Sequence, residues 1–277
     1  MTKKNLTTGV QENILDELDE AVAIASECEL IIMVGGDNTV TSGEGRDHCE
    51  LILAGRQREL IEKLSELGKP LVLVLENGRP LELSRETEVC DAILMTFFGG
   101  ETGAKAIVEC LLGQISPSGK LPISLPRSST RIPCYYSMHP GGERLFIEGP
   151  RDALYPFGFG MSYSSFAYSN LIIDKTGDYD VNVTCTVTNT GNMDADEVAQ
   201  LYIDDVESSI VTPLLLLKGF RRVSLKAGES KEVSFHLNWD SFKLMNARYE
   251  WVVEPGEFRI CIGAASNDIR LEGRVTL

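Results

Sequence analysis

A short glycine-rich segment, residues 35–48, gathers the side chains of this sequence that are best suited to proton transfer. It holds three carboxylates, one amide and one imidazole, namely Asp37, Asn38, Glu44, Asp47 and His48. Carboxylates and imidazoles are common general acids and bases, so the segment could form a polar functional loop. The same residue types are ordinary in solvent-exposed loops, and composition alone favours that second interpretation. A phosphate-binding loop is disfavoured, because no Lys-Ser or Lys-Thr pair follows the glycines and the dinucleotide-binding spacing is absent.

Elsewhere the reactive side chains are scattered along the sequence. His48, His139 and His236 share no metal-ligand spacing, and the seven cysteines lack the short spacings of zinc or redox motifs. We therefore expect neither a metal nor a cofactor. Most of the cysteines lie inside apolar runs, and we interpret them as reduced, buried small side chains.

Two other features each allow two interpretations. The segment 99–103, Gly-Gly-Glu-Thr-Gly, precedes a predicted helix and could bind an anion at the amino end of that helix. Close packing of a strand against the helix is the favoured explanation for its glycines. Four aromatic residues near the carboxyl end could stack against sugar rings, but burial in a core is favoured for them; they are Phe242, Tyr249, Trp251 and Phe258.

The elements around the polar loop predict an α/β domain. Residues 30–34, 71–75 and 92–97 are continuous apolar runs typical of buried strands. Amphipathic helical patterns alternate with them, and the inward positions are Ile14, Leu18, Ala21, Val22 and Ala25, then Leu60, Ile61, Leu64 and Leu67 before Gly68, then Ile107, Val108, Leu111 and Leu112 before Gly113. This alternation indicates a parallel sheet with helices on both faces. The polar loop would emerge at the carboxyl end of a strand, where such sheets usually bind ligands.

The second half of the sequence has a different periodicity. From about residue 114 to 165 the chain is rich in Pro, Gly, Ser and aromatic residues, which favours an irregular connector. From residue 166 apolar and polar residues alternate in short stretches separated by turns, as in an immunoglobulin or fibronectin type III-like antiparallel sandwich, and no helix is expected there. We assign residues 10–126 to the α/β domain, 127–165 to the connector and 166–277 to the sandwich.

Charge and hydropathy limit the classes of partner. The formal net charge of -15 with scattered basic residues argues against nucleic acid. No apolar run reaches the roughly 18 residues that a membrane helix needs. The first five residues, Met-Thr-Lys-Lys-Asn, lead into polar sequence without the apolar core of a secretory signal. The expected location is cytoplasmic if Met1 is the native start, and otherwise unknown.

An ordered series of motifs resembles the family 3 glycoside hydrolases. The segment Ser-Gly-Glu-Gly-Arg-Asp-His at 42–48, followed by residues 51–57, is similar to the acid/base loop of that family and the helix start after it. Further similar motifs follow in the same order at residues 69–78, 98–103, 116–122 and 155–163. The sandwich resembles the family's fibronectin type III-like domain at residues 189–191, 200–202 and 217–220. Each motif is weak alone, but the ordered series is specific.

The resemblance implies a retaining β-glycosidase of the β-glucosidase or β-xylosidase type, acting on a β-linked glucoside or xyloside. Such enzymes use two carboxylates about 5–5.5 Å apart, one as nucleophile and one as general acid and then base. In this sequence Glu44 would be the acid/base, and Asp47 and His48 would shape the loop. The family usually has Arg at the position of His48 and Pro at the position of Ala54.

The nucleophile of the family lies in an amino-terminal barrel, within a Ser-Asp-Trp motif. The two Trp residues of this sequence follow other residues: Trp239 follows Asn238, and Trp251 follows Glu250. A barrel of about 250 residues would not fit beside the two predicted domains. We therefore expect a carboxy-terminal part of a glycosidase, inactive alone, which supplies Glu44 to a barrel elsewhere. The alternatives are a non-catalytic carbohydrate-binding or scaffolding module and an unrelated structural use of both domains. The surface that would face a barrel could also drive homo-oligomerisation.

Overall fold

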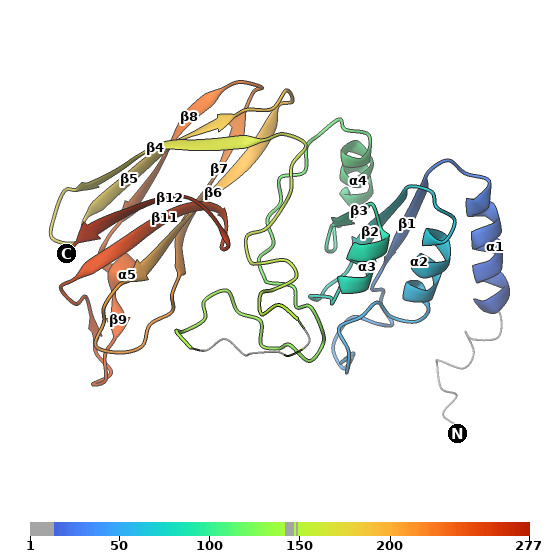
Figure 1. Cartoon of the computed structure of the whole chain (residues 1–277), viewed down its shortest axis with the longest axis horizontal. Coiled ribbons are helices and arrows are strands. Elements are labelled where there is room, and N and C mark those ends of the chain that lie inside the picture. The colour runs from blue at the N-terminus through green and yellow to red at the C-terminus, as the bar shows by residue number, and fades with distance from the viewer. Residues whose placement is uncertain (1–13, 142–146, 148) are drawn as a thin grey trace. The chain divides into compact units, whose positions relative to one another are not determined.

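The computed structural model describes residues 14–141, 147 and 149–277. The chain divides into two compact units (Figure 1). One unit comprises Met1–Ile107 and Pro126–Ile132, and the other comprises Val108–Leu125 and Pro133–Leu277. The first contains the parallel sheet, and the second contains the antiparallel sandwich with most of the connector. The predicted order of fold classes, α/β followed by an all-β sandwich, is confirmed.

The α/β unit is built on a three-stranded parallel sheet with the order β1-β2-β3. Its elements are α1 (Ile14–Ser26), β1 (Ile31–Gly36), α2 (Gln57–Ser65), β2 (Leu71–Glu76), α3 (Ser84–Val89), β3 (Ala92–Met95) and the first part of α4 (Gly103–Leu111), since the boundary between the units falls after Ile107. The strands are apolar except for Glu76 at the end of β2, as expected for a sheet that is covered by helices. Helix α2 contacts α1, α3 and β1, so these helices form one layer along the sheet (Figure 1).

The core of this unit lies between the sheet and that helical layer. Leu71, Leu73 and Leu75 on β2 are at most 1% exposed. Ile61 and Leu64 on α2 are buried, as are Leu18 and Ala25 on α1, all as the helical patterns predict. Gly68 and Gly113 both have positive φ, which fits their predicted places at helix ends.

Helix α4 departs from its prediction. Ile107 and Leu111 are half-buried, but Val108 is 51% exposed and Leu112, just beyond the helix, is 67% exposed. The prediction that these two residues face inward is wrong for the described chain. Helical periodicity identifies the apolar face of a helix, but it does not say whether anything covers that face.

The other unit contains a sandwich of two antiparallel sheets. One sheet has the order β4-β5-β8, and the other has the order β12-β11-β6-β7. The strands are β4 (Phe166–Lys175), β5 (Val181–Asn189), β6 (Ala195–Asp205), β7 (Leu216–Leu225), β8 (Ser230–Leu237), β11 (Glu257–Ala265) and β12 (Asp268–Thr276). The predicted alternation is confirmed, because Val181, Val183, Cys185 and Val187 on β5 are fully buried between polar neighbours.

The described residues of the connector form no regular helix or strand, and those after Ile132 pack on the sandwich through aromatic residues. The rings of Tyr136 and Phe157 stack with centroids 4.3 Å apart, and Tyr136 also meets the edge of buried Tyr202 on β6. Gln200 on the same strand donates hydrogen bonds to the backbone oxygens of Gly158 and Ala264. These contacts join the described connector residues after Ile132 to the strands of the same compact unit.

A short helix and a hairpin interrupt the sandwich, contrary to the expectation of no helix there. Helix α5 (Trp239–Phe242) begins with a capping box on Asn238, and β9 (Leu244–Met245) pairs with β10 (Trp251–Val252). Phe242 and Phe258 are buried, as predicted. Tyr249 is 88% exposed and Trp251 is 54% exposed, so the prediction of core burial is wrong for both. The β9–β10 hairpin is paired with neither sheet of the sandwich, and the rings of Tyr249 and Trp251 on it lie in solvent.

All seven cysteines are free, but their predicted burial holds only in part. Cys185 and Cys261 are buried within strands, where burial raises the pKa of each thiol to about 11. Cys28 and Cys49 are exposed, because Cys28 lies just after a helix and Cys49 just after the polar segment 35–48, both outside the core. The burial interpretation was therefore wrong for these two.

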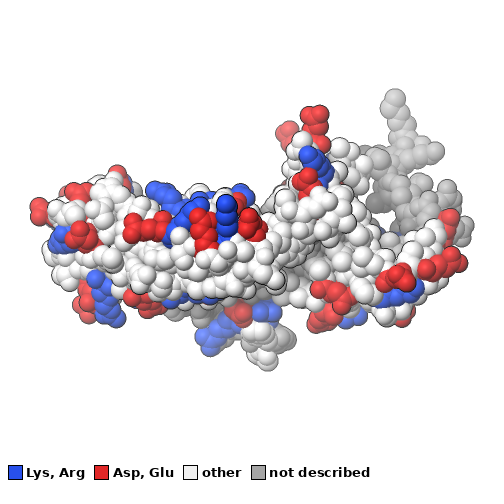
Figure 2. Space-filling view, turned by 90° about the horizontal axis from the view of Figure 1, so that it is seen from above, with Lys and Arg blue, Asp and Glu red and all other residues white. Residues whose placement is uncertain are grey.

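The surface charges are mixed. Acidic and basic side chains lie interspersed on the face shown in Figure 2. No described helix combines the length and apolar composition needed to cross a membrane.

Candidate active-site loop

The polar loop leaves β1 at the carboxyl edge of the parallel sheet, as the sequence predicts. Gly36, the last residue of β1, has a φ of +133°, and a Cβ there would lie 2.0 Å from the backbone oxygen of Glu76. Only glycine fits such a close approach of two strands. The loop therefore starts from a fixed point, with the Asp37 N–H donating to that same oxygen over 2.8 Å.

The side chain of Gln57 holds the base of the loop from the other side. Its Oε1 accepts from the Gly36 N–H over 2.6 Å, and its Nε2 donates to the backbone oxygens of Gly36 and Ala54, each over 2.9 Å. One amide side chain thus binds both ends of residues 37–54. Gln57 is the first residue of α2, so packing of that helix on the sheet fixes the loop.

An arginine from the next loop ties the polar segment together. Arg79 Nε donates to Asp37 Oδ2 over 3.3 Å, and its Nη2 donates to the Thr41 backbone oxygen over 2.6 Å. Both side chains are shielded, with Asp37 5% and Arg79 19% exposed. A shielded ion pair that is supported by further hydrogen bonds restricts the conformation of the polar segment far more than a surface ion pair would.

His48 contributes to the same fastening. Its Nε2 lies 2.9 Å from the Thr41 backbone oxygen. Because a carbonyl oxygen only accepts, Nε2 is the protonated nitrogen in this contact. Thr41 Oγ1 also donates to Asp37 Oδ1 over 2.9 Å, so Asp37, Thr41 and His48 form one hydrogen-bonded group with Arg79.

Glu44 and Asp47 lie outside that group. Both are exposed, and neither makes a hydrogen bond or ion pair with any residue that the structure describes. Glu44 stands between Gly43, with φ +137°, and Gly45, with φ +69°. The loop therefore has a fixed base and an exposed tip. The predicted roles of Glu44, Asp47 and His48 in catalysis and loop shaping stay predictions.

Phe98 brings an aromatic ring to the same edge of the sheet. A Cβ on Gly78 would lie 2.6 Å from Phe98 Cε2 and 3.1 Å from Ser42 Oγ. The ring thus covers Gly78 beside the start of the 42–48 motif, yet it is 57% exposed. Phe97 next to it has a φ of +53°, an uncommon conformation for an aromatic residue.

The glycines after Phe98 have a structural explanation. A Cβ on Gly99 would lie 2.8 Å from the Gly103 Cα, where α4 begins. This contact agrees with the favoured interpretation of close packing. Among the described residues, no group of three or more His, Cys, Asp or Glu side chains is placed to hold a metal ion.

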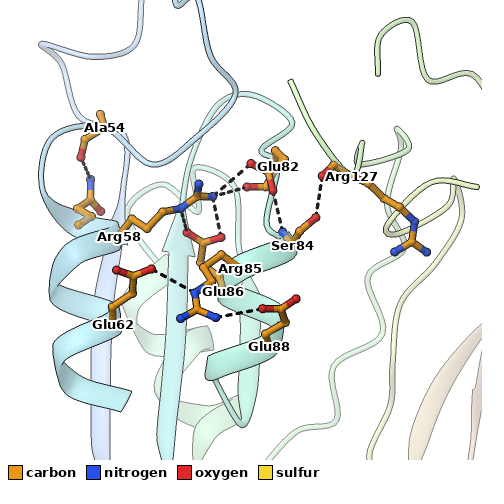
Figure 3. A network of polar contacts seen from close by, with 10 residues as sticks. Ala54, Arg58, Glu62, Glu82, Ser84, Arg85, Glu86, Glu88 and Arg127 are labelled. Atoms are coloured by element: carbon orange, nitrogen blue, oxygen red, sulfur yellow. Dashed lines mark hydrogen bonds and ion pairs between the residues drawn. The ribbon is translucent and has the colours of Figure 1, made fainter. Parts of the chain in front are cut away.

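Below the loop, a buried ionic network supports α2 and α3 (Figure 3). Arg58 donates to both carboxylate oxygens of Glu86, over 2.8 and 3.0 Å, and to the backbone oxygen of Glu82 over 3.0 Å. Glu86 is completely buried. Ser84 Oγ extends the network by donating to the Arg127 backbone oxygen over 2.8 Å. Because Arg58 follows Gln57 directly, the network also positions the residue that holds the loop.

Sequence reasoning missed three residues of this arrangement: Gln57, Arg58 and Arg79. Arg79 lies 42 residues from Asp37, and Gln57 lies 21 residues from Gly36. No local pattern links positions so far apart. The one available signal is topological and concerns Arg79 alone, which lies shortly after the end of β2, the strand adjacent to β1.

Comparison with known proteins agrees with the resemblance seen in the sequence. The model of the glycosyl hydrolase family 3 C-terminal domain matches residues 2–163, and that of the fibronectin type III-like domain matches residues 197–266.

Among curated relatives, the periplasmic beta-glucosidase of Salmonella typhimurium is 40% identical over 267 residues, which cover 91% of this chain and 35% of the relative. A beta-xylosidase of Formosa agariphila is 39% identical over 254 residues, covering 89% of this chain and 35% of the relative. Among solved structures, beta-glucosidase from Listeria innocua in complex with glucose superposes with a TM-score of 0.87 at 31% identity, covering 94% of this chain and 38% of that one.

The chain thus spans about a third of the length of the curated relatives that it matches. Its matched domain covers more than half of its own residues, and the fibronectin type III-like domain follows in order. On this evidence the chain belongs to glycosyl hydrolase family 3, of which it contains the C-terminal domain.

Proposed function

We propose that this chain supplies Glu44 as the acid/base of a retaining β-glycosidase whose nucleophile lies in the part of the relatives that this chain does not cover. The observation that carries the proposal is the contrast within the loop. Its base is fixed by Gln57 and Arg79, whereas Glu44 is exposed between two glycines of positive φ and has no hydrogen-bond or ion-pair partner in the part of the chain that the structure describes. The named relatives support a β-linked glucoside or xyloside as substrate.

In the first step, a carboxylate of the complementary part would attack the anomeric carbon while the glycosidic C–O bond breaks. Glu44 would donate its proton to the departing oxygen, leaving a covalent glycosyl-enzyme and an ionised Glu44. In the second step, Glu44 would take a proton from water as that water attacks the anomeric carbon and the bond to the nucleophilic carboxylate breaks, which releases the sugar and restores both the free carboxylate and the acid.

This mechanism needs an enclosed acid, because burial keeps a catalytic carboxyl protonated near neutral pH. In this chain Glu44 is exposed, so the enclosing groups would come from the complementary part. The exposed ring of Phe98 beside Ser42 would contribute an apolar wall from this side. The isolated chain is therefore expected to be inactive.

The test combines this chain with the part of the Salmonella typhimurium beta-glucosidase that it does not cover, and measures hydrolysis of aryl β-glucosides and β-xylosides. Glu44→Gln should lower kcat/KM about 10²- to 10⁴-fold, since it removes the proton donor. Added azide should rescue the variant and form a glycosyl azide, because an anion can attack without a general base. Glu50→Gln, another exposed carboxylate of the same loop, is the matched control and should behave as the parent does.

Two results would contradict the proposal. One is turnover by the isolated chain that Glu44→Gln abolishes. The other is restored hydrolysis in the mixture that Glu44→Gln leaves unchanged.

One observation favours a second candidate, a non-catalytic carbohydrate-binding module. Tyr249 and Trp251 are exposed on the β9–β10 hairpin, and the Lys243 ammonium lies 4.9 Å from the Trp251 ring centroid and 5.2 Å from that of Trp239. Exposed aromatic rings with polar edges suit sugar stacking. Binding of β-glucan oligosaccharides that Trp251→Ala abolishes, without rescue of hydrolysis in the mixture, would favour this function over the first.

A further inference from the structure

A polar cavity of about 330 Å³ lies where strands of both sheets of the sandwich meet the connector. Connector residues line it together with Phe166 and Tyr168 on β4, Glu197 on β6, and Asp268 and Arg270 on β12. All of them belong to the same compact unit, in which β4 lies beside β12 (Figure 1). A cavity of this size is at the lower end of the range for small-molecule sites.

A buried carboxylate stands in the wall of this cavity. The side chain of Glu197 is only 4% exposed, and its Oε1 accepts a hydrogen bond from the Tyr168 hydroxyl over 3.1 Å. The other oxygen, Oε2, makes no hydrogen bond with any described residue. Among those residues, the only side-chain N or O atom that is both enclosed and unpartnered is Asn77 Oδ1, so Glu197 Oε2 is reached from the cavity. A buried carboxylate oxygen normally has a donor, and here a ligand would supply it.

The ammonium group of Lys120 lies beside this carboxylate. Its Nζ is 3.3 Å from Glu197 Oε1 and donates to the Gly160 backbone oxygen over 3.0 Å, and its side chain is 13% exposed. An ammonium has three N–H donors, so one of them remains for a ligand. The wall therefore offers a charged donor next to a charged acceptor. Two hydroxyls on neighbouring carbon atoms match this pair, because one accepts from Lys120 while the other donates to Glu197 Oε2.

The charges around the cavity compensate one another. Arg270 donates two hydrogen bonds to the Asp268 carboxylate, over 2.6 and 2.7 Å, as Lys120 faces Glu197 on the other wall. A metal ion in the cavity would be repelled by Lys120 and Arg270, and an anion would be repelled by Glu197 and Asp268. The lining thus favours a neutral ligand that carries several hydroxyl groups.

Two aromatic rings supply an apolar wall. Phe166 and Tyr168 are two residues apart on β4, so they share one face of that strand. Both are half-buried against the core of the sandwich, and the Arg270 guanidinium carbon lies 6.0 Å from the Tyr168 ring centroid. Aromatic rings beside polar groups suit a ligand with apolar C–H faces and a polar edge. A pyranose ring has both properties.

We propose that this cavity binds one pyranose residue, with two neighbouring hydroxyls of the sugar held between the Lys120 ammonium and the Glu197 carboxylate. The inference goes beyond the proposed function, because none of its observations involves Glu44 or the loop that carries it. It also names a different site from the exposed rings of the β9–β10 hairpin. The competing explanation is that Lys120, Glu197 and Tyr168 stabilise the fold alone and the cavity holds only water.

The direct test is an NMR titration of the full chain with methyl β-D-glucopyranoside and methyl β-D-xylopyranoside. The amides of residues 160–168 and 264–270 should shift saturably, with a Kd on the order of 1 mM. The 3-deoxy analogue of the glucoside is the matched ligand, because it keeps its other hydroxyls but has no two on neighbouring carbon atoms. It should bind about tenfold more weakly, since one of the two charge-assisted hydrogen bonds is lost.

Two variants probe the protein side of the same contact. Glu197→Gln replaces the carboxylate by an amide of the same size, and Lys120→Met removes the ammonium but keeps an apolar stem. Each should weaken binding of the glucoside about tenfold. Glu232→Gln, at an exposed carboxylate on β8 that does not line the cavity, is the matched control and should bind as the parent does. If either cavity variant fails to fold, the comparison with the 3-deoxy analogue decides the matter, because it needs no substitution.

Several outcomes would overturn the proposal. They are equal affinity for the glucoside and its 3-deoxy analogue, shifts confined to the β9–β10 hairpin, and shifts of the cavity amides with sodium sulfate or calcium chloride but with neither glycoside. The absence of any saturable shift at about tenfold above the expected Kd would do so as well. Hydrolysis restored in the mixture without sugar binding here would leave the proposed function standing and remove this inference. Binding here without hydrolysis would leave this inference standing.

Discussion

The sandwich and the α/β unit differ in whether their outermost strands have neighbouring strands. In the sandwich, β12 lies beside β4 and β7 lies beside β8, so the two sheets adjoin along both edges. Those strands also carry charges, among them Arg270 and Glu272 on β12 and Lys231 on β8. In the α/β unit, the outer edge of β1 has no neighbouring strand among the described residues, and β1 carries no charged side chain. The difference teaches that the sandwich pairs or charges its outermost strands, whereas the unit with the candidate site leaves an apolar edge open among those residues.

A substitution in the core of the sandwich should give the largest loss of stability, and it tests whether the two units unfold separately. Phe258 is 1% exposed and meets Phe242 edge-on at 5.1 Å between centroids. Phe258→Ala should cost about 3–5 kcal/mol, because it removes a buried ring and leaves a cavity. In urea unfolding followed by domain-resolved NMR signals, only the sandwich transition should move. A matching shift of the α/β transition would show that the two units unfold as one.

The α/β unit should respond most strongly to loss of its buried ionic network. Arg58→Ala leaves the fully buried Glu86 carboxylate without its two-pronged partner. The expected cost is about 3 kcal/mol, at the low end for a broken buried pair because Arg58 itself is partly exposed. Urea unfolding of the α/β signals provides the measurement. Arg85→Ala, in an exposed pairing with Glu62 and Glu88, is the matched control and should leave the α/β transition close to that of the parent.

A smaller effect concerns the fixed base of the loop. Gln57→Ala removes three hydrogen bonds from the backbone around Gly36 and Ala54, which should destabilise the α/β unit by about 1–2 kcal/mol. The same change should speed amide exchange at Gly36, because its N–H loses its acceptor. If the variant is as stable as the parent and its amide exchange is unaltered, the hydrogen bonds of Gln57 contribute nothing to the stability of the α/β unit.

The smallest expected effect lies in the sandwich and depends on pH. Burial, aided by the nearby Glu254 and Asp204 carboxylates, raises the pKa of Asp205 from 3.8 to about 6. A carboxyl whose folded pKa is raised stabilises the fold while protonated, and that contribution is lost as pH rises from about 4 through about 6. Asp205→Asn should therefore stabilise the sandwich at pH 7 and raise its Tm. The gain in the free energy of unfolding should be no more than about 1 kcal/mol, because the group is partly solvated. The advantage should vanish at pH 4, and a gain of equal size at both pH values would exclude this explanation.

Sequence patterns predicted the elements that repeat and missed those that do not. Apolar residues alternate from Val181 to Val187, and burial alternates with them. The apolar run of β2 is likewise mostly buried. The hydrophobic pattern of each strand therefore matches its burial, and the fold class could be predicted from it. Helix α5 has only four residues, too few for a helical period to show. Tyr249 and Trp251 resemble core residues by type, but the hairpin that carries them leaves the sheets.

The candidate loop shows the same division between local and distant information. Its position after β1 could be predicted, because the apolar run and the glycines are local signals. The hydrogen bonds that hold it could not be predicted, because Arg79 can bind Asp37 and Thr41 only once β1 and β2 are in register. The exposure of Glu44 likewise follows from tertiary contacts that are made by its neighbours and not by Glu44 itself.

The amide of Gln57 couples the last residue of β1 to the far end of the loop. Its Oε1 accepts from the Gly36 N–H, and its Nε2 donates to the backbone oxygens of both Gly36 and Ala54. A change at Gly36 that withdrew this amide would therefore release Ala54 at the same time. The end of the strand and the loop that carries Glu44 would then lose their order in a single event.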